Sequence, residues 1–302
     1  MAADFRYRQL GYVVLNVTDV ERSSTFATET FGLDMVGEAG DGARFFRAGP
    51  KHHDLILNPA KEAAFARSAW ELETDADLDK AFAHFKSIGL EPAWLGDNEC
   101  ASLSLERAFR VVEPVAGTTH EYYSKITVIS APLTNTLTKF QGGKHYGLSL
   151  PDPKAMNDFM VEQMGFKVSD YLEGWRGSLL RCFPNPDHHS FGALSGPKTG
   201  FHHLAFRVCE IDDIGKMFNR AKRQDVKVHF GIGRHPTSGS IHFYVYDPDF
   251  FVWEYTMGME QFPEIGAREP RRMSAAPENY DLWGAVPDQE FSGRSPPYLV
   301  AA

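Results

Sequence analysis

The sequence predicts an α+β fold of four βαβββ modules that are paired into two domains, and three observations lead to it. The chain has 302 residues, about the length of two domains of ordinary size. Residues 12–38 align without a gap with residues 145–171, which lie 133 positions further along. A second match, at an offset of 136, joins residues 70–85 to residues 206–221. Self-similarity over so long a period indicates that a folding unit has been duplicated.

The first of these units carries the local signals of a strand, a helix and further short strands. Asp19 is a predicted helix N-cap, residues 20–31 have helical spacing, and Gly32 ends the helix. The predicted strands are rich in aromatic and branched residues and comprise residues 11–17, 43–46 and 54–57. We expect the same order of elements in each module.

Composition changes mark the expected domain boundaries. The N-terminal pair of modules is expected over residues 1–130 and the C-terminal pair over residues 138–258. Between them, residues 129–135 form a stretch rich in Ser, Pro and Thr, which is typical of a linker. Residues 259–302 contain six prolines and little periodicity, so we expect an irregular tail on the C-terminal domain.

Composition also excludes several classes of function. With 31 Lys and Arg against 40 Asp and Glu, the net charge is −9, and no basic run is present, so we expect no nucleic-acid partner. The three cysteines are far apart and form no CxxC motif, which favours a reduced cytoplasm. The N-terminus lacks the apolar core of a signal peptide, and no apolar run is long enough for a membrane span. We therefore expect a cytoplasmic protein that acts on a small molecule.

The candidate chemistry lies on predicted strands of the C-terminal half. Residues 201–208 and 243–255 read as strands, and each carries one side chain that can bind a metal, His203 and Glu254. A third candidate, His145, begins a similar strand upstream. Two histidines and one carboxylate are the ligand set of non-heme Fe(II) oxygenases. The sequence therefore predicts an iron-dependent dioxygenase.

The repeat provides an internal comparison for these ligands. His145 corresponds to Tyr12 in the first half, and His203 corresponds to Arg67, which has no lone pair for a metal. The counterpart of Glu254 is expected to be Glu121. Because the first half retains at most one of the three ligands, we expect one metal site per chain, in the C-terminal half. The pair of modules at 138–258 is therefore expected to be catalytic and metal-binding, and the pair at 1–130 non-catalytic.

At these residues the sequence resembles the type I extradiol ring-cleaving dioxygenases of the vicinal-oxygen-chelate superfamily, above all the enzymes that open 2,3-dihydroxybiphenyl and related catechols. The likeness covers most of the chain. The motifs that carry it are residues 144–148, 186–190, 201–203, 233–235, 243–244, 253–255 and 281–284. It implies that each domain is an incomplete mixed β-barrel with outer helices, the glyoxalase/bleomycin-resistance/dioxygenase fold.

The same resemblance implies a reaction and roles for the residues. His145, His203 and Glu254 would bind Fe(II), with Mn(II) as the alternative, and the substrates would be a catechol and O2. Extradiol (meta) cleavage of the ring would serve the degradation of aromatic compounds, and the protein would be a homo-oligomer. His189 would stabilise bound oxygen and shuttle a proton, while His235 and Tyr244 would hydrogen-bond the substrate oxygens. His189 is preferred over the adjacent His188 because it directly precedes a predicted strand.

Two other readings stay open on the same fold. One is a metal-dependent isomerase or lyase of the glyoxalase type, which usually assembles four ligands. The other is a non-enzymatic protein that binds a small molecule without metal.

Some residues near the motifs have expected structural roles only. His202 should point away from His203 if the strand is regular. His188 and the pair at positions 52–53 adjoin polar residues, so we expect them in solvent. The family usually has a glycine where this chain has Phe250, so the turn there is expected to be remodelled.

Overall fold

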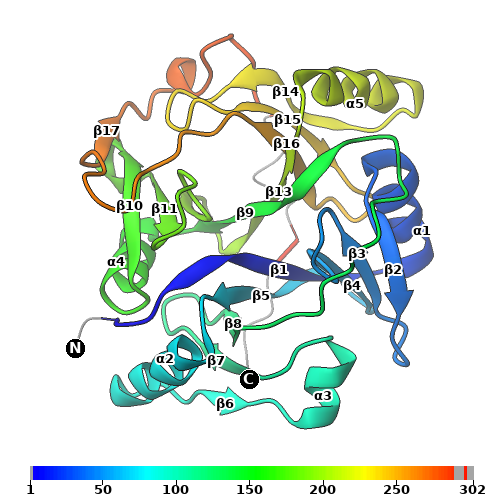
Figure 1. Ribbon diagram of the computed structural model, residues 1–302. Coiled ribbons are helices and arrows are strands. Elements are labelled where there is room, and N and C mark those ends of the chain that lie inside the picture. The colour runs from blue at the N-terminus through cyan, green and yellow to red at the C-terminus, as the bar shows by residue number, and fades with distance from the viewer. Residues whose placement is uncertain (1–2, 289–295, 298–302) are drawn as a thin grey trace.

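Two mixed β-sheets, one from each half of the chain, form the framework of the molecule (Figure 1). The computed structural model describes residues 3–288 and 296–297. The first sheet consists of β1 (Tyr7–Val17), β2 (Asp34–Glu38), β3 (Arg44–Arg47), β4 (Leu55–Pro59), β5 (Ala64–Leu72), β6 (Ala93–Trp94), β7 (Ala108–Val112) and β8 (Thr119–Tyr123). The second consists of β9 (Phe140–Leu150), β10 (Phe166–Leu172), β11 (Gly177–Cys182), β12 (Phe191–Ser195), β13 (Gly200–Val208), β14 (Val228–Arg234), β15 (Ile241–Tyr246), β16 (Val252–Met257) and β17 (Arg271–Met273).

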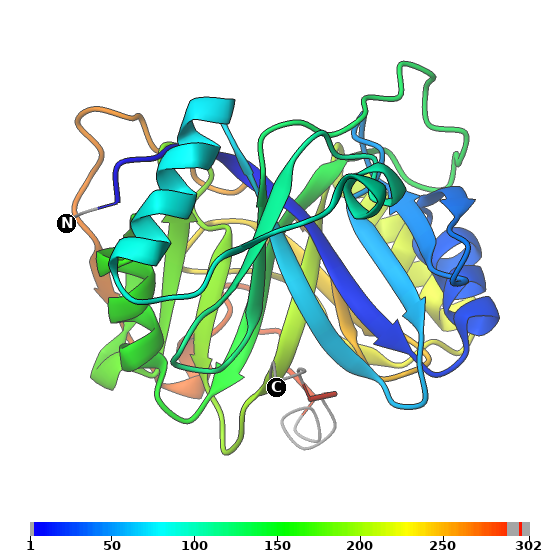
Figure 2. The same ribbon diagram turned by 90° about the horizontal axis from the view of Figure 1, so that it is seen from below.

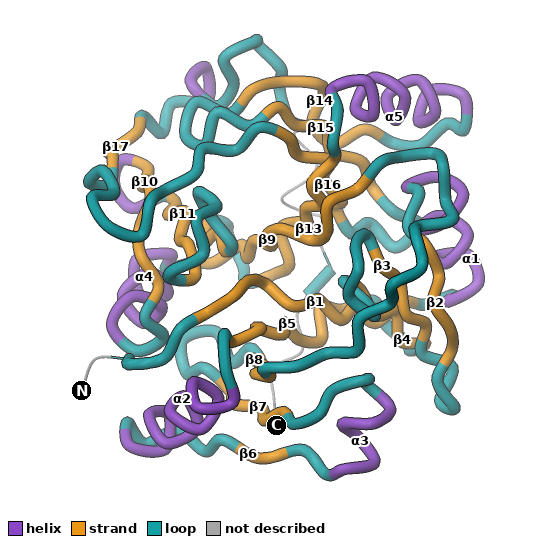
Figure 3. The backbone as a smooth tube through the Cα atoms, in the orientation of Figure 1, coloured by secondary structure: helices purple, strands orange, loops and turns teal. Residues whose placement is uncertain are grey.

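Helices lie on the outside of the sheets (Figure 3). They are α1 (Val20–Thr25), which continues as the π-helical η1 (Phe26–Phe31), α2 (Asp75–Ser87), α3 (Asp97–Ser102), α4 (Pro153–Glu162) and α5 (Ile211–Arg223). Two short 3-10 helices, η2 (Glu173–Trp175) and η3 (Pro277–Asn279), complete the described elements.

The sheet pairing confirms the four predicted βαβββ modules. In every module the first strand pairs in parallel with the last: β1 with β4, β5 with β8, β9 with β12, and β13 with β16. A parallel pair needs a long crossover, and the module helix is part of it. Two modules join in each sheet through their first strands, because β1 pairs antiparallel with β5 and β9 with β13.

The helix ends show that the repeat predicted the local structure. Asp19 Oδ1 accepts a hydrogen bond from the backbone N–H of Arg22, and Asp152 Oδ1 accepts one from Ala155, each at 3.0 Å. These equivalent N-caps satisfy donors that the first helical turn leaves unpaired. At the other end, Gly32 and its counterpart Gly165 have φ values of 98° and 74°, a left-handed conformation that glycine adopts without strain.

The turn before β16 has the positive φ that a glycine would favour, so the prediction that Phe250 avoids this conformation by remodelling the turn is wrong. Phe250 adopts φ 66°, and its N–H donates to the carbonyl oxygen of Asp247 at 3.0 Å. The Asp247 carboxylate accepts hydrogen bonds from the backbone N–H groups of Asp249 and Phe251, each at 2.9 Å. These contacts hold the backbone in a conformation that is unfavourable for a residue with a side chain.

The two halves contact each other through both core and helices. Figure 2 shows α2 beside α4, and the His84 ring of α2 is hydrogen-bonded to the carbonyl oxygen of Gln163 at 2.7 Å. Arg220 of α5 donates to the carbonyl oxygen of Thr30 at 2.5 Å, across to η1. One hydrophobic cluster contains residues of both sheets, among them Trp70 and Trp253. The domain boundaries at 130 and 138 stay a prediction.

After β16 the chain continues as an irregular tail, which runs to the edge of the second sheet at β10 (Figure 1). Its strand β17 pairs in parallel with β10 at the sheet edge. Among the described residues, no helix combines the length and the apolar character that crossing a membrane requires.

Candidate metal centre and substrate cavity

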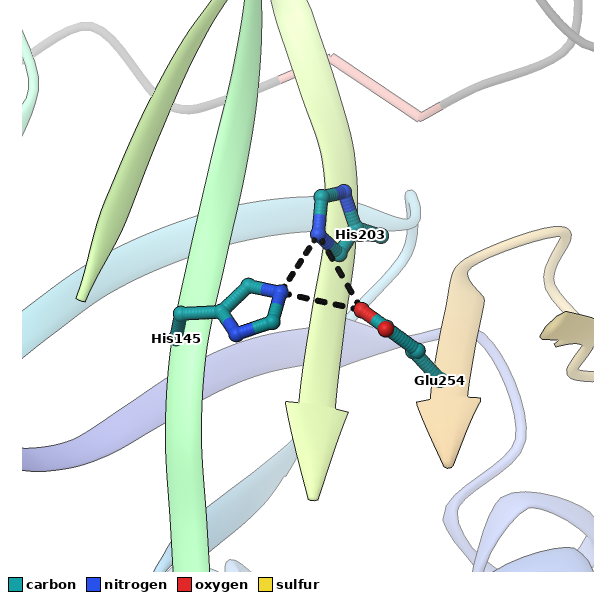
Figure 4. A group of neighbouring side chains, drawn as sticks. All are labelled: His145, His203 and Glu254. Carbon is teal, nitrogen blue, oxygen red and sulfur yellow. Dashed lines mark hydrogen bonds and ion pairs between the residues drawn. The ribbon is translucent and has the colours of Figure 1, made fainter. Parts of the chain in front are cut away.

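Three neighbouring strands bring the predicted ligands together. Ala205 of β13 pairs with His145 of β9 on one side and with Glu254 of β16 on the other. His203 lies two residues before Ala205 and therefore on the same face of β13. All three ligand side chains then point to one place above the small Ala205 side chain, as Figure 4 shows for the ligands.

The ligand atoms have the spacing that a metal ion requires. His145 Nε2 lies 3.0 Å from His203 Nε2 and 2.9 Å from Glu254 Oε2, and His203 Nε2 lies 3.5 Å from the same oxygen. Bonds of about 2.1 Å that meet at right angles place ligand atoms about 3 Å apart. The three groups therefore match one face of an octahedral ion and leave the opposite face open.

The charge and burial of the cluster also fit a cation. Glu254 is fully buried, and the ion pairs that it forms among the described residues are with imidazoles, not with lysine or arginine. Its Oε1 and the Nδ1 of His145 have no hydrogen-bond partner there. Since a buried carboxylate needs a compensating charge, a divalent metal ion bound by His145, His203 and Glu254 fits the site.

The predicted catalytic residues surround this cluster. The His189 ring is centred 4.1 Å from the His145 ring. On the other side of the ligand set, His235 Nε2 lies 2.9 Å from the Tyr244 hydroxyl and 4.0 Å from Glu254 Oε1. Burial lowers the pKa of His189 well below its ordinary value and that of His235 to about 3, so both rings are neutral at pH 7. A neutral imidazole can donate one hydrogen bond and accept another.

A cavity of about 750 Å³ opens beside the ligands. His203 lines it together with His189, His235 and Tyr244, so one predicted ligand and the three predicted catalytic residues face the same space. Most of the remaining wall is apolar and includes Leu172, Leu179, Leu194, Phe230 and Met273. This volume and lining are typical of a site for a small organic ligand.

Comparison with known proteins identifies the family. The model of the Glyoxalase/Bleomycin resistance protein/Dioxygenase superfamily matches residues 9–125 and 143–255. The chain belongs to this superfamily. It is 26% identical to the 3-methylcatechol 2,3-dioxygenase of Pseudomonas putida, over 84% of this chain and 91% of that protein. It is 24% identical to an iron-dependent extradiol dioxygenase of Rhodococcus jostii, over 92% of this chain and 96% of that protein.

A solved structure is similar over most of the chain. The Mn(II)-bound glyoxalase from Novosphingobium aromaticivorans superposes with a TM-score of 0.83 at 26% identity, and the match covers 95% of this chain and 94% of that one. Iron and manganese are thus both found among the relatives of this chain.

The N-terminal half carries an ion-pair cluster at the positions that correspond to the ligands of the C-terminal half. Ala69 pairs with Tyr12 and with Glu121, as Ala205 pairs with His145 and Glu254, which confirms the predicted correspondence. The Tyr12 hydroxyl donates to Glu121 Oε1, and Arg67 and Arg110 donate to Oε2 at 3.2 and 2.7 Å. Guanidinium groups therefore balance the buried Glu121 carboxylate. Within residues 3–288 and 296–297, the C-terminal cluster is the only group with metal-ligand geometry.

Several histidines do not lie where the sequence predicted. His202 lines the cavity, because two residues of β13 oppose one of β9 between Phe201 and His203. Such a β-bulge breaks the alternation of side chains that the prediction assumed. His188 and His53 are fully buried and not in solvent, and His188 Nε2 is hydrogen-bonded to Asp170 Oδ2 at 2.9 Å.

Two further parts of the site depend on contacts that no sequence pattern predicts. Asp170 is buried and accepts hydrogen bonds from the distant Arg268 and Arg271, a set of contacts that no local pattern contains. Gly147 lies against the ligand His203, a contact that only the pairing of β9 with β13 creates. The motif at 281–284 contains Asp281 but does not predict a contact for its carboxylate.

Gly147→Ala is expected to weaken metal binding about tenfold, the effect usual for changes beside a ligand. A Cβ atom at this position would lie 3.0 Å from Cε1 and 3.1 Å from Nδ1 of the His203 ring, so the ring must shift. Titration of the apo-protein with Fe(II) or Mn(II) measures the affinity.

The matched control is Gly192→Ala. Gly192 pairs with Gly147 on the neighbouring strand, and its Cβ would meet atoms no closer than 3.6 Å. Equal metal affinity in both variants would contradict the predicted displacement of His203.

Proposed function

We propose that the chain is an extradiol dioxygenase that cleaves a catechol-type aromatic diol and inserts both atoms of O2. The observation that carries this proposal is the cluster of His145, His203 and Glu254, whose His203 lines a cavity together with His189, His235 and Tyr244. The named catechol and extradiol dioxygenases among its relatives support the same reaction.

The proposed cofactor is Fe(II), with Mn(II) as the alternative. When bound, such an ion supplies open coordination positions for the diol and for O2 and allows electrons to pass between them. The diol itself provides the reducing electrons, so no external reductant is needed. The carboxylate of Glu254 and the two neutral imidazoles give a net charge that suits a divalent ion.

The protein residues would bind the diol and move its protons. Tyr244 and His235 are hydrogen-bonded to each other, and the pair can accept a hydrogen bond from a diol hydroxyl and hold its proton at the imidazole. His189 can donate a hydrogen bond to the negative charge that develops on the oxygen derived from O2. It can later transfer a proton to that oxygen. The apolar wall excludes water, which strengthens these polar interactions.

Oxygen uptake tests the proposal directly. The protein is loaded with Fe(II) without oxygen, supplied with a panel that includes 3-methylcatechol and 2,3-dihydroxybiphenyl, and then exposed to O2. Stoichiometric oxygen consumption with a yellow ring-opened product is expected. No oxygen uptake with any catechol, in protein that has bound one metal ion, would overturn the proposal.

A glyoxalase-type isomerase is the second candidate, because one similar structure is a Mn(II)-bound glyoxalase. Against it stands the ligand set, since the described cluster has three ligands where such enzymes usually have four. Turnover of a thiol adduct without oxygen uptake would favour this reaction over ring cleavage.

His189→Asn is expected to lower kcat about 100-fold while the metal content stays at one per chain. The variant removes the imidazole that can exchange a proton but leaves all three ligands. Steady-state oxygen uptake, normalised to bound metal, measures the effect.

The adjacent His188 is the matched control for this prediction. Because His188 faces Asp170 and not the cavity, His188→Asn is expected to lower the melting temperature but to retain kcat. The opposite pattern would assign the catalytic role to His188.

The proposal includes a cytoplasmic homo-oligomer. Size-exclusion chromatography with light scattering tests the oligomeric state, and a monomer would contradict that part.

A further inference from the structure

Part of the C-terminal tail lines the cavity that His203 also lines. Tyr280, Asp281 and Leu282 contribute to the cavity wall, although they are distant in sequence from the strands that carry the ligands. The Leu282 N–H donates to the carbonyl oxygen of Arg234 at 2.9 Å, which fixes this part of the tail to β14. We refer to residues 279–288 as the tail segment.

Asp281 is the polar anchor of the tail segment. Its Oδ1 accepts hydrogen bonds from the N–H groups of Trp283 and Ala285, at 2.7 and 3.0 Å, and so shapes the turn. Its Oδ2 lies 2.8 Å from Nε2 of His242, a residue of β15 that is fully buried. The carboxylate therefore joins the tail to the interior of the second sheet.

The His242 ring supports the catalytic His235. The two rings are parallel within 19°, and their centres lie 3.9 Å apart. His235 in turn is hydrogen-bonded to the Tyr244 hydroxyl. A chain of contacts thus runs from Asp281 through His242 to His235, which would hydrogen-bond the diol in the proposed function.

Gly233 makes this arrangement possible. It pairs with His242 across β14 and β15, and Asp281 lies directly over it. A Cβ atom here would overlap with Asp281 Oδ2 and lie 2.8 Å from His242 Nε2. Because the first contact is impossible, any side chain at 233 must displace the Asp281 carboxylate.

We propose that Asp281 is a positioning residue, which holds the His242 ring as the surface against which His235 packs, so that docking of the tail segment completes the acid–base side of the site. The inference rests on the proposed dioxygenase function. It assigns to the tail a part in the reaction, although Asp281 is not one of the proposed metal ligands.

The test compares three changes around the carboxylate. Asp281→Ala frees His242, and Gly233→Ala displaces the same carboxylate from another strand. Both are expected to lower kcat about 10- to 100-fold with one metal still bound, because a small displacement of a catalytic group has effects of this size. Asp281→Asn retains an acceptor for the turn and can donate to the other tautomer of His242, so it is expected to keep most of the activity.

Asp288→Ala is the matched control within the tail segment. Asp288 ties the tail to Lys227 at 2.9 Å, away from His235. Its loss is expected to leave kcat unchanged. Hydrogen exchange of the apo-protein provides a readout apart from activity: the amides of Leu282, Trp283 and Ala285 should lose protection in Asp281→Ala and Gly233→Ala.

A double-mutant cycle decides whether Asp281 acts through His235. In a His235→Asn background, Asp281→Ala is expected to cause no further loss of kcat, since the residue that it positions is absent. Additive losses, or an Asp281→Asn defect as large as that of Asp281→Ala, would overturn the inference. So would loss of amide protection with unchanged kcat. A wild-type protein that binds metal but consumes no oxygen would instead overturn the proposed function, and this inference with it.

Discussion

His145→Phe is expected to abolish metal binding and dioxygenase activity together, whereas Tyr12→Phe, the same substitution at the equivalent position of the other half, leaves one metal per chain. The phenylalanine ring has no lone pair, so the first variant leaves two ligands on a buried site. In the second, only a hydroxyl that donates to Glu121 is lost, and two arginines still balance that carboxylate.

Elemental analysis and metal-dependent melting measure this pair of variants. A ligand at 100 times its Kd stabilises a folded protein by about 2.7 kcal/mol, so added metal should raise the melting temperature of wild type and Tyr12→Phe. His145→Phe should show no such rise. Metal bound in the His145→Phe protein, or lost from the Tyr12→Phe protein, would refute the assignment of the site to the C-terminal half.

The ligand set could be predicted because it obeys a local rule and a repeat. The two histidines and the carboxylate on predicted strands match a known ligand set, and the duplication shows which positions of the other half lack ligands. The pairing of Ala205 and Ala69 with their neighbours later confirmed that correspondence. Four modules and their helix caps followed from the same signals.

The remaining features depend on contacts between distant segments. A β-bulge directs His202 into the cavity, and no sequence pattern in residues 201–208 predicts this bulge. His188 is buried because Asp170 accepts its hydrogen bond from another strand. Phe250 holds a conformation that local propensity disfavours, because the Asp247 carboxylate fixes the turn around it. In each case tertiary structure outweighs the local preference.

Asp170→Asn is expected to lower the free energy of unfolding by about 3 kcal/mol, the lower end of the range for breaking a buried ion pair. The Asp170 side chain is fully buried and accepts hydrogen bonds from His188 and from two tail arginines, Arg268 at 2.9 Å and Arg271 at 2.6 Å. The substitution removes the buried charge partner of both arginines and leaves them only the partly exposed Glu260. The arginines are partly exposed, so solvent compensates for some of the loss. Urea unfolding measures the change.

Glu260→Gln is the matched control, because Glu260 binds the same two arginines at the surface. Its side chain is 34% exposed, against 0% for Asp170, and exposed ion pairs contribute less than about 1 kcal/mol. Similar destabilisation by both variants would show that burial of the Asp170 carboxylate does not determine its contribution.

The pH dependence of stability should also separate wild type from Asp170→Asn. Burial by itself raises the pKa of Asp170, but hydrogen bonds from His188, Arg271 and Arg268 outweigh it and hold the pKa below its ordinary value of about 3.9. The folded protein therefore binds this proton less readily than the unfolded chain. The contribution is complete above about pH 4 and is lost as the pH falls toward the folded-state pKa. Between wild type and Asp170→Asn, the difference in free energy of unfolding should thus shrink below about pH 4. A difference that stays constant through this range would show that the carboxylate charge does not hold the tail against β10.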